Sequence, residues 1–270
     1  MKKIIYKLRS FTTYIVSYRK SEESYLHSDV PLSECRNHYN YLFDIGNKNG
    51  IKVLEIGSRV VTGSNYRSQF KNAEYTGFDY YNGENVDIVG DAHKLSEYFN
   101  KDEKFDIIFS SSVFEHLAMP WLLPIEISKL LKVGGVVFIE THFSHCSHER
   151  PWHFYQFSDM GLKVLFNSNL GFECLEAGMS NPLVARFSNL ADDYLRYIPV
   201  TGLYCHSSYL GKKVKDVDFN VFDWNKLNLD DVVGNTKYIL FFGSSKYFFS
   251  TLPYDLYICI SFLSDEKSGH

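Results

Sequence analysis

Short apolar runs alternate with amphipathic stretches from residue 52 to residue 178. The apolar runs are rich in β-branched and aromatic residues, and they predict strands at 52–56, 74–78, 86–89, 105–110, 136–141 and 172–178. Apolar positions at helical spacing predict helices near 64–71, 94–100, 120–132 and 158–169. This alternation is typical of an α/β fold with a doubly wound, mostly parallel sheet that carries helices on both faces.

The alternation breaks after residue 178 and strand character returns only at 254–263. Between them, residues 189–198 predict a helix, and the remaining stretches are prone to turns. We expect four parts: an N-terminal helical leader (1–48), the core (49–179), an insertion over the open end of the sheet (180–252), and the last strand with a C-terminal tail (253–270).

Composition and charge narrow the class of protein. The chain has 270 residues, of which 45% are hydrophobic, and its net charge of −4 provides no general attraction to nucleic acid. Its five cysteines are odd in number and widely spaced, which favours reduced thiols in the cytoplasm. Residues 1–20 mix basic and aromatic side chains, so we expect a solvated leader helix, with peripheral membrane contact as the alternative. No stretch of 18 apolar residues predicts a spanning helix.

A glycine-containing loop follows the strand at 52–56. Such a loop between a strand and a helix presents backbone N–H groups to a nucleotide-like ligand. Arg59 interrupts the G-x-G-x-x-G spacing, so the loop alone does not identify the ligand. Glu55 lies in the apolar strand, and because an unpaired buried carboxylate is costly, we expect it to have a structured polar role.

Five segments follow one another in order: VLEIG (53–57), GFDYY (77–81), GDAHKL (90–95), FDIIFSSSVFEHL (105–117) and ISKLLKVGG (127–135). Together they resemble the class I S-adenosylmethionine-dependent methyltransferases, and among these the group with a methyltransferase type 11 domain. The resemblance covers roughly residues 50–178, with 254–263 as a seventh strand, and it implies a seven-stranded Rossmann-like sheet with S-adenosylmethionine as cofactor. Arg59 replaces the family's second loop glycine, so we expect either a wider approach of the ligand there or an outward-directed Arg59 side chain.

The resemblance also implies the cofactor contacts. Asp79 would accept the ribose hydroxyls, Asp91 the adenine amine, and Glu55 would lie beneath the methionine portion. A turn acid and a helix cap are the structural alternatives for the two aspartates. A dinucleotide dehydrogenase also fits an acid about 20 residues beyond the glycines, but the glycine fingerprint is incomplete. The full implied set of cofactor contacts is Glu55, Gly57, Ser58, Gly63, Asp79, Tyr80, Asp91, Ala92, Ser110 and Ser111.

Histidines are concentrated after the strand at 136–141, at His142, His145, His148 and His153. Methyl transfer from a sulfonium needs alignment, and it needs a base if the acceptor is a hydroxyl. As candidates for that base we take His148, His153 and also His116, which follows the fourth strand. A divalent metal site and a purely structural loop are the alternatives. We assign no metal ligand, because the H-E-x-x-H spacing is absent.

We therefore expect a cytoplasmic methyltransferase that acts on oxygen in a small-molecule or glycan acceptor, without nucleic acid as a partner. The glycan suggestion comes from resemblance to methyltransferases of surface-polysaccharide pathways. A lipid or quinone methyltransferase is the enzymatic alternative. The other alternative, raised by Arg59, is a methyltransferase-fold protein without catalysis that acts as a binding partner or scaffold. No oligomeric state is assigned.

Overall fold

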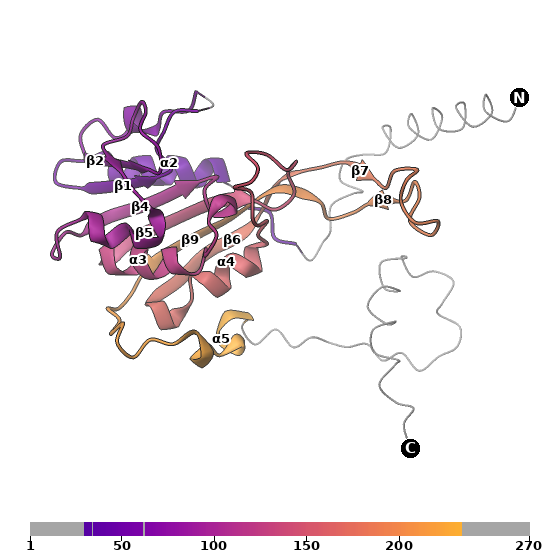
Figure 1. Cartoon of the computed structure of the whole chain (residues 1–270). Helices are drawn as coiled ribbons and strands as arrows, with labels where there is room; N and C mark the ends of the chain where they lie inside the picture. The colour runs from indigo at the N-terminus through magenta and orange to yellow at the C-terminus, as the bar shows by residue number, and fades with distance from the viewer. Residues whose placement is uncertain (1–29, 34, 62, 234–270) are drawn as a thin grey trace, which may run out of the picture. The chain divides into compact units, whose positions relative to one another are not determined.

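The computed structural model describes residues 30–33, 35–61 and 63–233. They are organised around a seven-stranded sheet with the order β3-β2-β1-β4-β5-β9-β6 (Figure 1). Strands β1 to β5 pair in parallel, whereas β9 runs antiparallel to both of its neighbours. The strands are β1 Lys52–Ile56, β2 Glu74–Asp79, β3 Ile88–Val89, β4 Phe105–Ser111, β5 Leu131–His142, β6 Phe172–Pro182 and β9 Tyr204–Lys213.

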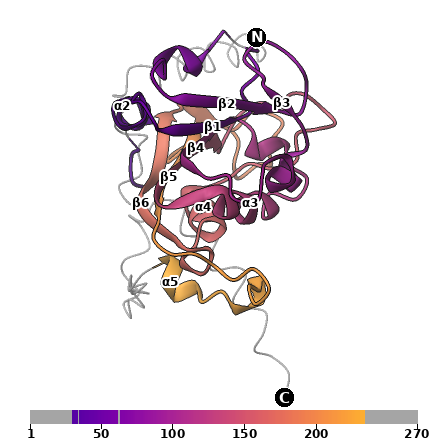
Figure 2. The same ribbon diagram turned by 90° about the vertical axis from the view of Figure 1, so that its left-hand side faces the viewer.

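Helices cover both faces of the sheet. Helix α2 lies on one face, and α3 and α4 lie on the other (Figures 1 and 2). Alternate residues of β1 point to opposite faces, so that Val53 packs towards α2 and Leu54 towards α3. The helices are α2 Cys35–Gly46, α3 Leu122–Leu130, α4 Asp159–Leu165 and α5 Leu229–Val233, with short 3₁₀ helices η2 Tyr66–Gln69, η3 Ala92–Tyr98, η4 Phe114–His116, η5 Ser168–Leu170 and η6 Trp224–Lys226.

The predicted strands of the core are confirmed, and β1 has the predicted bounds. Two helix predictions were wrong in type, because the stretches at 64–71 and 94–100 form the 3₁₀ helices η2 and η3. The helix predicted at 189–198 is also wrong, because that stretch forms turns. Its apolar side chains Leu190 and Tyr194 are 90% and 66% exposed, so no packed surface stabilises a helix there.

The position of the seventh strand is the main difference from the prediction. The strand expected at 254–263 lies outside the described residues. Strand β9, between β5 and β6, comes from the segment that we assigned to an insertion, so 180–252 is not an insertion throughout. The sequence of β9 does not look apolar, because it contains the serines Ser207 and Ser208, which are both buried. Ser207 Oγ donates to the carbonyl of Phe157, in the loop before α4, at 2.8 Å.

An arm between β6 and β9 is what remains of the expected insertion. It includes the two-stranded pair of β7 Ala185–Arg186 and β8 Pro199–Val200. The arm begins where β6 ends, at the sheet edge that also carries the carboxyl ends of β1, β4 and β5. None of its residues lines the cavity described below, so the predicted cover over that cavity is not formed by the arm.

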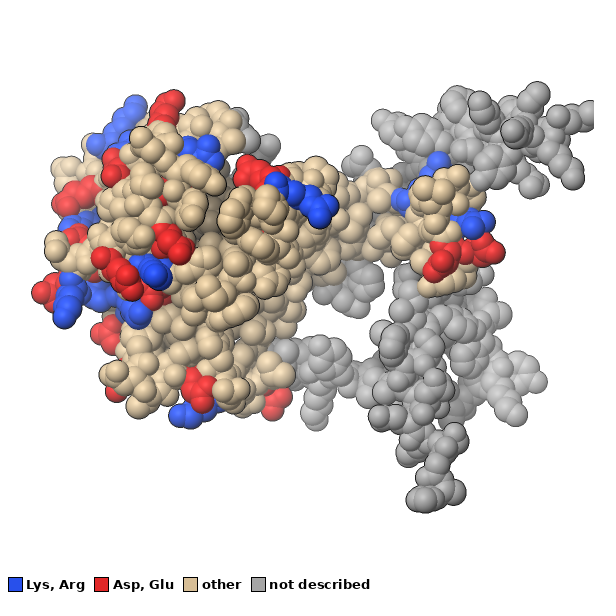
Figure 3. All heavy atoms as spheres, in the orientation of Figure 1, with Lys and Arg blue, Asp and Glu red and all other residues tan. Residues whose placement is uncertain are grey.

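The surface of the described residues carries both signs of charge. On the face drawn in Figure 3, Lys and Arg side chains alternate with Asp and Glu and gather into no broad basic area. A basic stripe is the electrostatic footprint of proteins that bind nucleic acid. Among the described residues, no helix combines the length and the hydropathy that crossing a bilayer requires. The membrane contact predicted for residues 1–20 lies outside the described residues.

Candidate functional site

A cavity of about 590 Å³ opens at the carboxyl ends of the parallel strands. This volume falls within the range of about 300–1,000 Å³ that small-molecule sites occupy. Its walls come from the ends of β1, β2, β4 and β5, from the loops that follow them, and from the segment after β3. Ligands bind at this edge in open α/β sheets, because the strand order reverses there and the loops diverge.

Gly57 turns the chain sharply at the end of β1. Its φ of +83° lies in the left-handed region that favours glycine, and a Cβ atom there would lie 2.2 Å from Val113 Cγ2. The loop after β1 and the loop after β4 therefore meet closely at the cavity wall. Any side chain at this position would displace the Val113 side chain.

Asp79 ends β2, and its carboxylate faces the cavity. Oδ1 accepts the Tyr81 N–H at 2.9 Å, and Oδ2 accepts the Arg59 N–H at 3.2 Å. The side chain is only 13% exposed, so the two backbone donors fix its orientation. Because an ionised carboxylate has about four acceptor positions, each oxygen keeps capacity for another donor.

Arg59 does not point outward, which was one of our two expectations; the other, a wider approach of the ligand, stays a prediction. Its Nε lies 3.5 Å from Asp79 Oδ1, and its guanidinium lies over the Tyr81 ring at 5.4 Å from the centroid. The side chain is therefore directed along the cavity wall, towards the carboxylate. A donor that approaches Asp79 Oδ1 therefore has this guanidinium as a neighbour.

Asp91 follows β3 and caps the N-terminus of η3, which was the structural alternative to a cofactor contact at this position. Its Oδ1 accepts both the His93 N–H at 3.0 Å and the His93 Nδ1–H at 2.6 Å. Burial opposes ionisation of Asp91, but the hydrogen bonds from His93 outweigh it and hold the pKa of the carboxyl below its ordinary value. Both bonds fall on Oδ1, which leaves Oδ2 for a ligand in the cavity.

Glu55 is the buried acid of β1, and it is 4% exposed. It accepts hydrogen bonds from the Tyr75 hydroxyl and from Asn85 Nδ2, the latter at 3.1 Å. Burial raises the pKa of Glu55 to about 8, although the Asn85 hydrogen bond and the Arg67 charge oppose the shift and Asp79 adds to it. Glu55 is therefore a neutral carboxyl group at neutral pH, held by hydrogen bonds in the wall of the cavity.

We expect the stability of the ligand-free protein to fall as pH rises from about 4.5 to about 8 because of Glu55. In that window the folded state retains a proton that the unfolded state has lost. The slope is about 1.4 kcal/mol per pH unit for one such group. Glu55→Gln keeps a hydrogen-bond acceptor but removes the group that titrates. In urea unfolding from pH 5 to 9, the free energy of unfolding of this variant should therefore rise relative to that of the wild type up to about pH 8. Parallel pH profiles would contradict this.

The remaining predicted cofactor contacts divide into two groups. Gly63 and Ser110 do not line the cavity, and Ser110 is fully buried. Its neighbour Ser111 does line the cavity and donates to Glu140 Oε1 at 3.3 Å. The predicted contacts that line the cavity are Glu55, Gly57, Ser58, Asp79, Tyr80, Asp91, Ala92 and Ser111.

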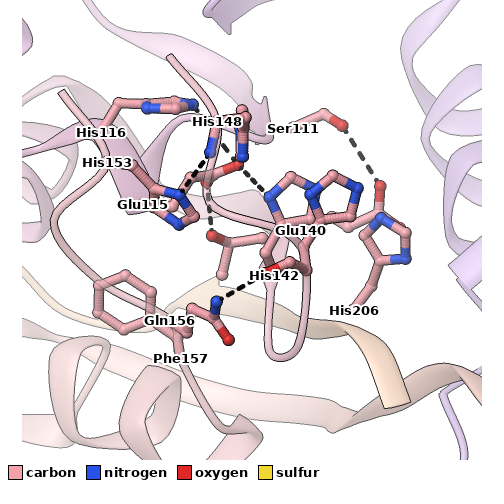
Figure 4. Close-up of polar contacts among 12 residues, drawn as sticks. Ser111, Glu115, His116, Glu140, His142, His148, His153, Gln156, Phe157 and His206 are labelled. Carbon is pink, nitrogen blue, oxygen red and sulfur yellow. Dashed lines mark hydrogen bonds and ion pairs between the residues drawn. The ribbon is translucent and has the colours of Figure 1, made fainter. Parts of the chain in front are cut away.

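A histidine cluster lies at the ends of β4 and β5. Figure 4 shows His116, His142, His148 and His153 gathered around the fully buried Glu115. His142 Nδ1 is 2.8 Å from Glu115 Oε1, and Thr141 Oγ1 donates to Glu115 Oε2 at 2.7 Å. Burial opposes ionisation of Glu115, but His142 and Thr141 outweigh it and lower the pKa of its carboxyl.

The Glu115–His142 pair was not predicted. No role of its own was predicted for Glu115. Its Oε1 also lies 3.9 Å from His116 Nε2. The signal was present, because Glu115 follows β4 and His142 ends β5, and these strands are adjacent and parallel. Side chains at the carboxyl ends of neighbouring parallel strands come together at one sheet edge.

The carbonyl oxygens around the histidine cluster determine which ring nitrogen carries the proton. His116 Nδ1 is 2.8 Å from the Trp152 carbonyl, and His148 Nδ1 is 3.0 Å from the Cys146 carbonyl. His145 Nδ1 lies 3.2 Å from the same carbonyl oxygen of Cys146. Carbonyl oxygens only accept, so each ring carries a proton on Nδ1 and, when neutral, a lone pair on Nε2.

His153 differs from the other members of the cluster. It does not line the cavity, and its Nδ1 accepts the His148 backbone N–H at 3.2 Å. Desolvation and the neighbouring His148 and His116 lower the pKa of His153. The lone pair on Nδ1 of this ring is therefore already engaged, whereas His116 and His148 line the cavity, and their Nδ1 contacts leave the lone pair on Nε2.

Solved structures similar to this chain include several methyltransferases. A SAM-dependent methyltransferase from Archaeoglobus fulgidus is 18% identical, with 66% of this chain and 94% of that chain covered and a TM-score of 0.44. The Burkholderia thailandensis 1,6-didemethyltoxoflavin-N1-methyltransferase is 14% identical, with coverages of 79% and 90% and a TM-score of 0.46. A putative methyltransferase from Bacillus halodurans is 14% identical, with coverages of 66% and 100% and a TM-score of 0.46.

The sequence comparisons identify the family. No curated protein is significantly similar to the chain. Residues 26–170, which are 145 of the 270 residues, match the family model described as a methyltransferase domain. The type 11 subdivision is finer than this match and stays a prediction. Because the model matches more than half of the chain, the protein belongs to the methyltransferase domain family, and it is an enzyme whose cofactor is S-adenosylmethionine.

Proposed function

We propose that the protein transfers a methyl group from S-adenosylmethionine to an oxygen of a small or carbohydrate-type acceptor. One observation carries this proposal: a single cavity is lined both by Asp79 and Asp91 and by His116 and His148. In the strand order β3-β2-β1-β4-β5, the two carboxylates lie on one side of β1 and the histidines on the other. Cofactor and acceptor would thus meet above the end of β1.

The residues on the carboxylate side fit the cofactor. Asp91 Oδ2 would accept the adenine amine, and the remaining acceptor positions of Asp79 would take the ribose hydroxyls. Gly57 brings backbone close to the cavity without a side chain, and Glu55 lines the wall where a cationic amino group would pair with its carboxylate form. When bound, S-adenosylmethionine supplies a methyl group on a sulfonium that leaves as a neutral thioether.

His116 is the best-placed base for a hydroxyl acceptor. The Trp152 carbonyl holds Nδ1–H, so the lone pair on Nε2 is available on the cavity wall. As the acceptor oxygen bonds to the methyl carbon and the carbon–sulfur bond breaks, the hydroxyl proton would pass to His116 Nε2. His153 would act as a positioning residue, because it holds the backbone of His148.

Aromatic side chains support an acceptor with a flat or ring-shaped face. Tyr80, Tyr81, Trp152 and Phe154 all line the cavity, and each is between 42% and 60% exposed. Such exposed rings offer large contact areas to sugar or aromatic rings. We place the enzyme in the cytoplasm, which the free thiols of Cys146, Cys174 and Cys205 among the described residues support.

Two measurements test the proposal. Calorimetry should show binding of S-adenosylmethionine and of S-adenosylhomocysteine, and absence of binding for both would favour the scaffold alternative. Methyl-labelled S-adenosylmethionine should then transfer label to members of a panel of monosaccharides and nucleotide-activated sugars. Transfer to hydroquinone or lipid probes alone would replace the proposed acceptor class with the lipid or quinone alternative.

A further inference from the structure

Three histidines in the cluster recur at every third position. His142 is the last residue of β5, and His145 and His148 follow in the loop, giving the pattern H-x-x-H-x-x-H. Their rings contact one another: those of His142 and His145 stack at 4.2 Å, and that of His148 lies 5.2 and 5.1 Å from them. All three line the cavity.

The donor atoms of these rings are close enough to share one ion. Each of His142, His145 and His148 offers a ligand atom, and the three atoms lie within 4.8 Å of one another. Zn–N bonds of about 2.0–2.1 Å put ligand nitrogens about 3–4 Å apart. The rings of His142 and His145 are stacked with their planes 11° apart, so their in-plane lone pairs do not yet converge. His142 is buried, whereas His145 is exposed and His148 is half-buried, so these two side chains would turn to bring their lone pairs onto one ion.

The second nitrogen of each ring is held by oxygen, as in metal sites. Metal-ligating histidines donate their other ring N–H to a carboxylate or a backbone carbonyl, which fixes the tautomer and the ring orientation. His142 Nδ1 lies 2.8 Å from Glu115 Oε1 as an ion pair, and Thr141 Oγ1 donates to the other oxygen of that carboxylate. His145 and His148 donate to the carbonyl of Cys146. All three lone pairs are thereby assigned to Nε2.

We propose that His142, His145 and His148 bind one divalent transition metal ion of the zinc type through Nε2, with open coordination positions towards the cavity. Three imidazoles suit zinc and its first-row neighbours better than magnesium or calcium. Three protein ligands leave at least one position open, which distinguishes such a site from a closed structural one. Metal binding by the three histidines does not depend on the proposed function. Only the further assignment, that the acceptor oxygen takes the open position beside His116, rests on it.

The binding test uses untagged full-length protein that has been freed of metal with a chelator. Titration with Zn²⁺ by calorimetry, and with Co²⁺ by visible absorption, should each show one equivalent bound. Loss of a group that merely holds a metal ligand in place lowers metal affinity roughly 10–100-fold. His145→Asn and His148→Asn remove the ligand itself, so each should lower the affinity for Zn²⁺ by at least that much. Glu115→Gln changes only the group that holds His142, so its loss of Zn²⁺ affinity should stay within that range of about 10–100-fold. Substoichiometric binding by the wild type, or wild-type affinity in both ligand variants, overturns the proposal.

Two controls separate the possible causes of a negative result. Cys146→Ser keeps the carbonyl that orients two of the rings but removes the thiol, whose Sγ is 3.6 Å from His145 Nδ1. Unchanged affinity in this variant supports the three-imidazole site, and a large loss overturns it in favour of a thiolate ligand. Calorimetry with S-adenosylmethionine on the same preparations tests the proposed function independently of metal binding, and a variant that still binds the cofactor is folded. Metal binding without cofactor binding would refute the proposed function and leave the metal site standing.

Discussion

Replacing His116 with glutamine is expected to lower turnover by roughly 10²–10⁴-fold, the usual cost of losing a general base. The glutamine amide would retain a donor for the Trp152 carbonyl but would have no basic nitrogen for the acceptor proton. Cofactor affinity should be nearly unchanged, because Asp79 and Asp91 lie on the other side of β1. Single-turnover transfer of labelled methyl to the acceptor found in the panel measures the rate directly.

Met119→Ala is the matched control for disturbance of the same loop. Met119 is 42% exposed and does not line the cavity, so its truncation should leave turnover near the wild-type value. A base contributes to the transition state, and its loss should therefore lower kcat and kcat/KM together. Wild-type turnover in the His116→Gln variant would remove His116 from the reaction.

His148→Ala should also lower turnover, and metal content distinguishes its role from that of His116. If His148 is a ligand, the variant loses bound Zn²⁺ together with activity, while His116→Gln retains one equivalent. Loss of activity in the His148 variant with full metal content would instead make His148 a base, since this residue lines the cavity and the contact of its Nδ1 with the Cys146 carbonyl leaves the lone pair on Nε2.

The core strands were predictable because parallel strands buried on both faces consist of nearly continuous apolar residues. Strand β9 was not predictable in this way. It lies between β5 and β6 in the sheet, but its sequence includes His206, Ser207 and Ser208, and Ser207 finds its hydrogen-bond partner in the Phe157 carbonyl. Those partners lie some 50 residues away in the chain, so a local pattern contains no sign of them.

The candidate site was predictable where it depends on strand ends, and less so where it depends on side-chain pairing. Asp79 and Asp91 were located by their positions after β2 and β3, and both line the cavity. The turn of the Arg59 side chain towards Asp79 was not foreseen, because a loop residue's direction is set by its tertiary partners. The pairing of Glu115 with His142 likewise required the order of β4 and β5 in the sheet.

Replacing Asp79 with alanine is expected to weaken S-adenosylmethionine binding by roughly 1–3 kcal/mol, about 5- to 150-fold. In the proposed complex the carboxylate accepts the ribose hydroxyls while the Arg59 and Tyr81 N–H groups hold it in place. Removing it leaves those hydroxyls without a charged acceptor in a largely buried position. Calorimetric titration with S-adenosylmethionine measures the change, and unchanged affinity would exclude Asp79 from the cofactor site.

Glu84→Ala is the matched control, because it removes the same charge from the loop after β2 at an exposed position outside the cavity lining. Its affinity should stay close to that of the wild type, whereas a loss as large as that of Asp79→Ala would assign the effect to net charge. Arg59→Ala adds a second comparison. In the proposed complex a ribose hydroxyl would approach Asp79 Oδ1, from which Arg59 Nε lies 3.5 Å, so removing the guanidinium should leave affinity equal or higher. A weaker complex would mean that Arg59 itself contacts the cofactor, and that this loop binds S-adenosylmethionine through a side chain instead of the close backbone approach that a second glycine permits.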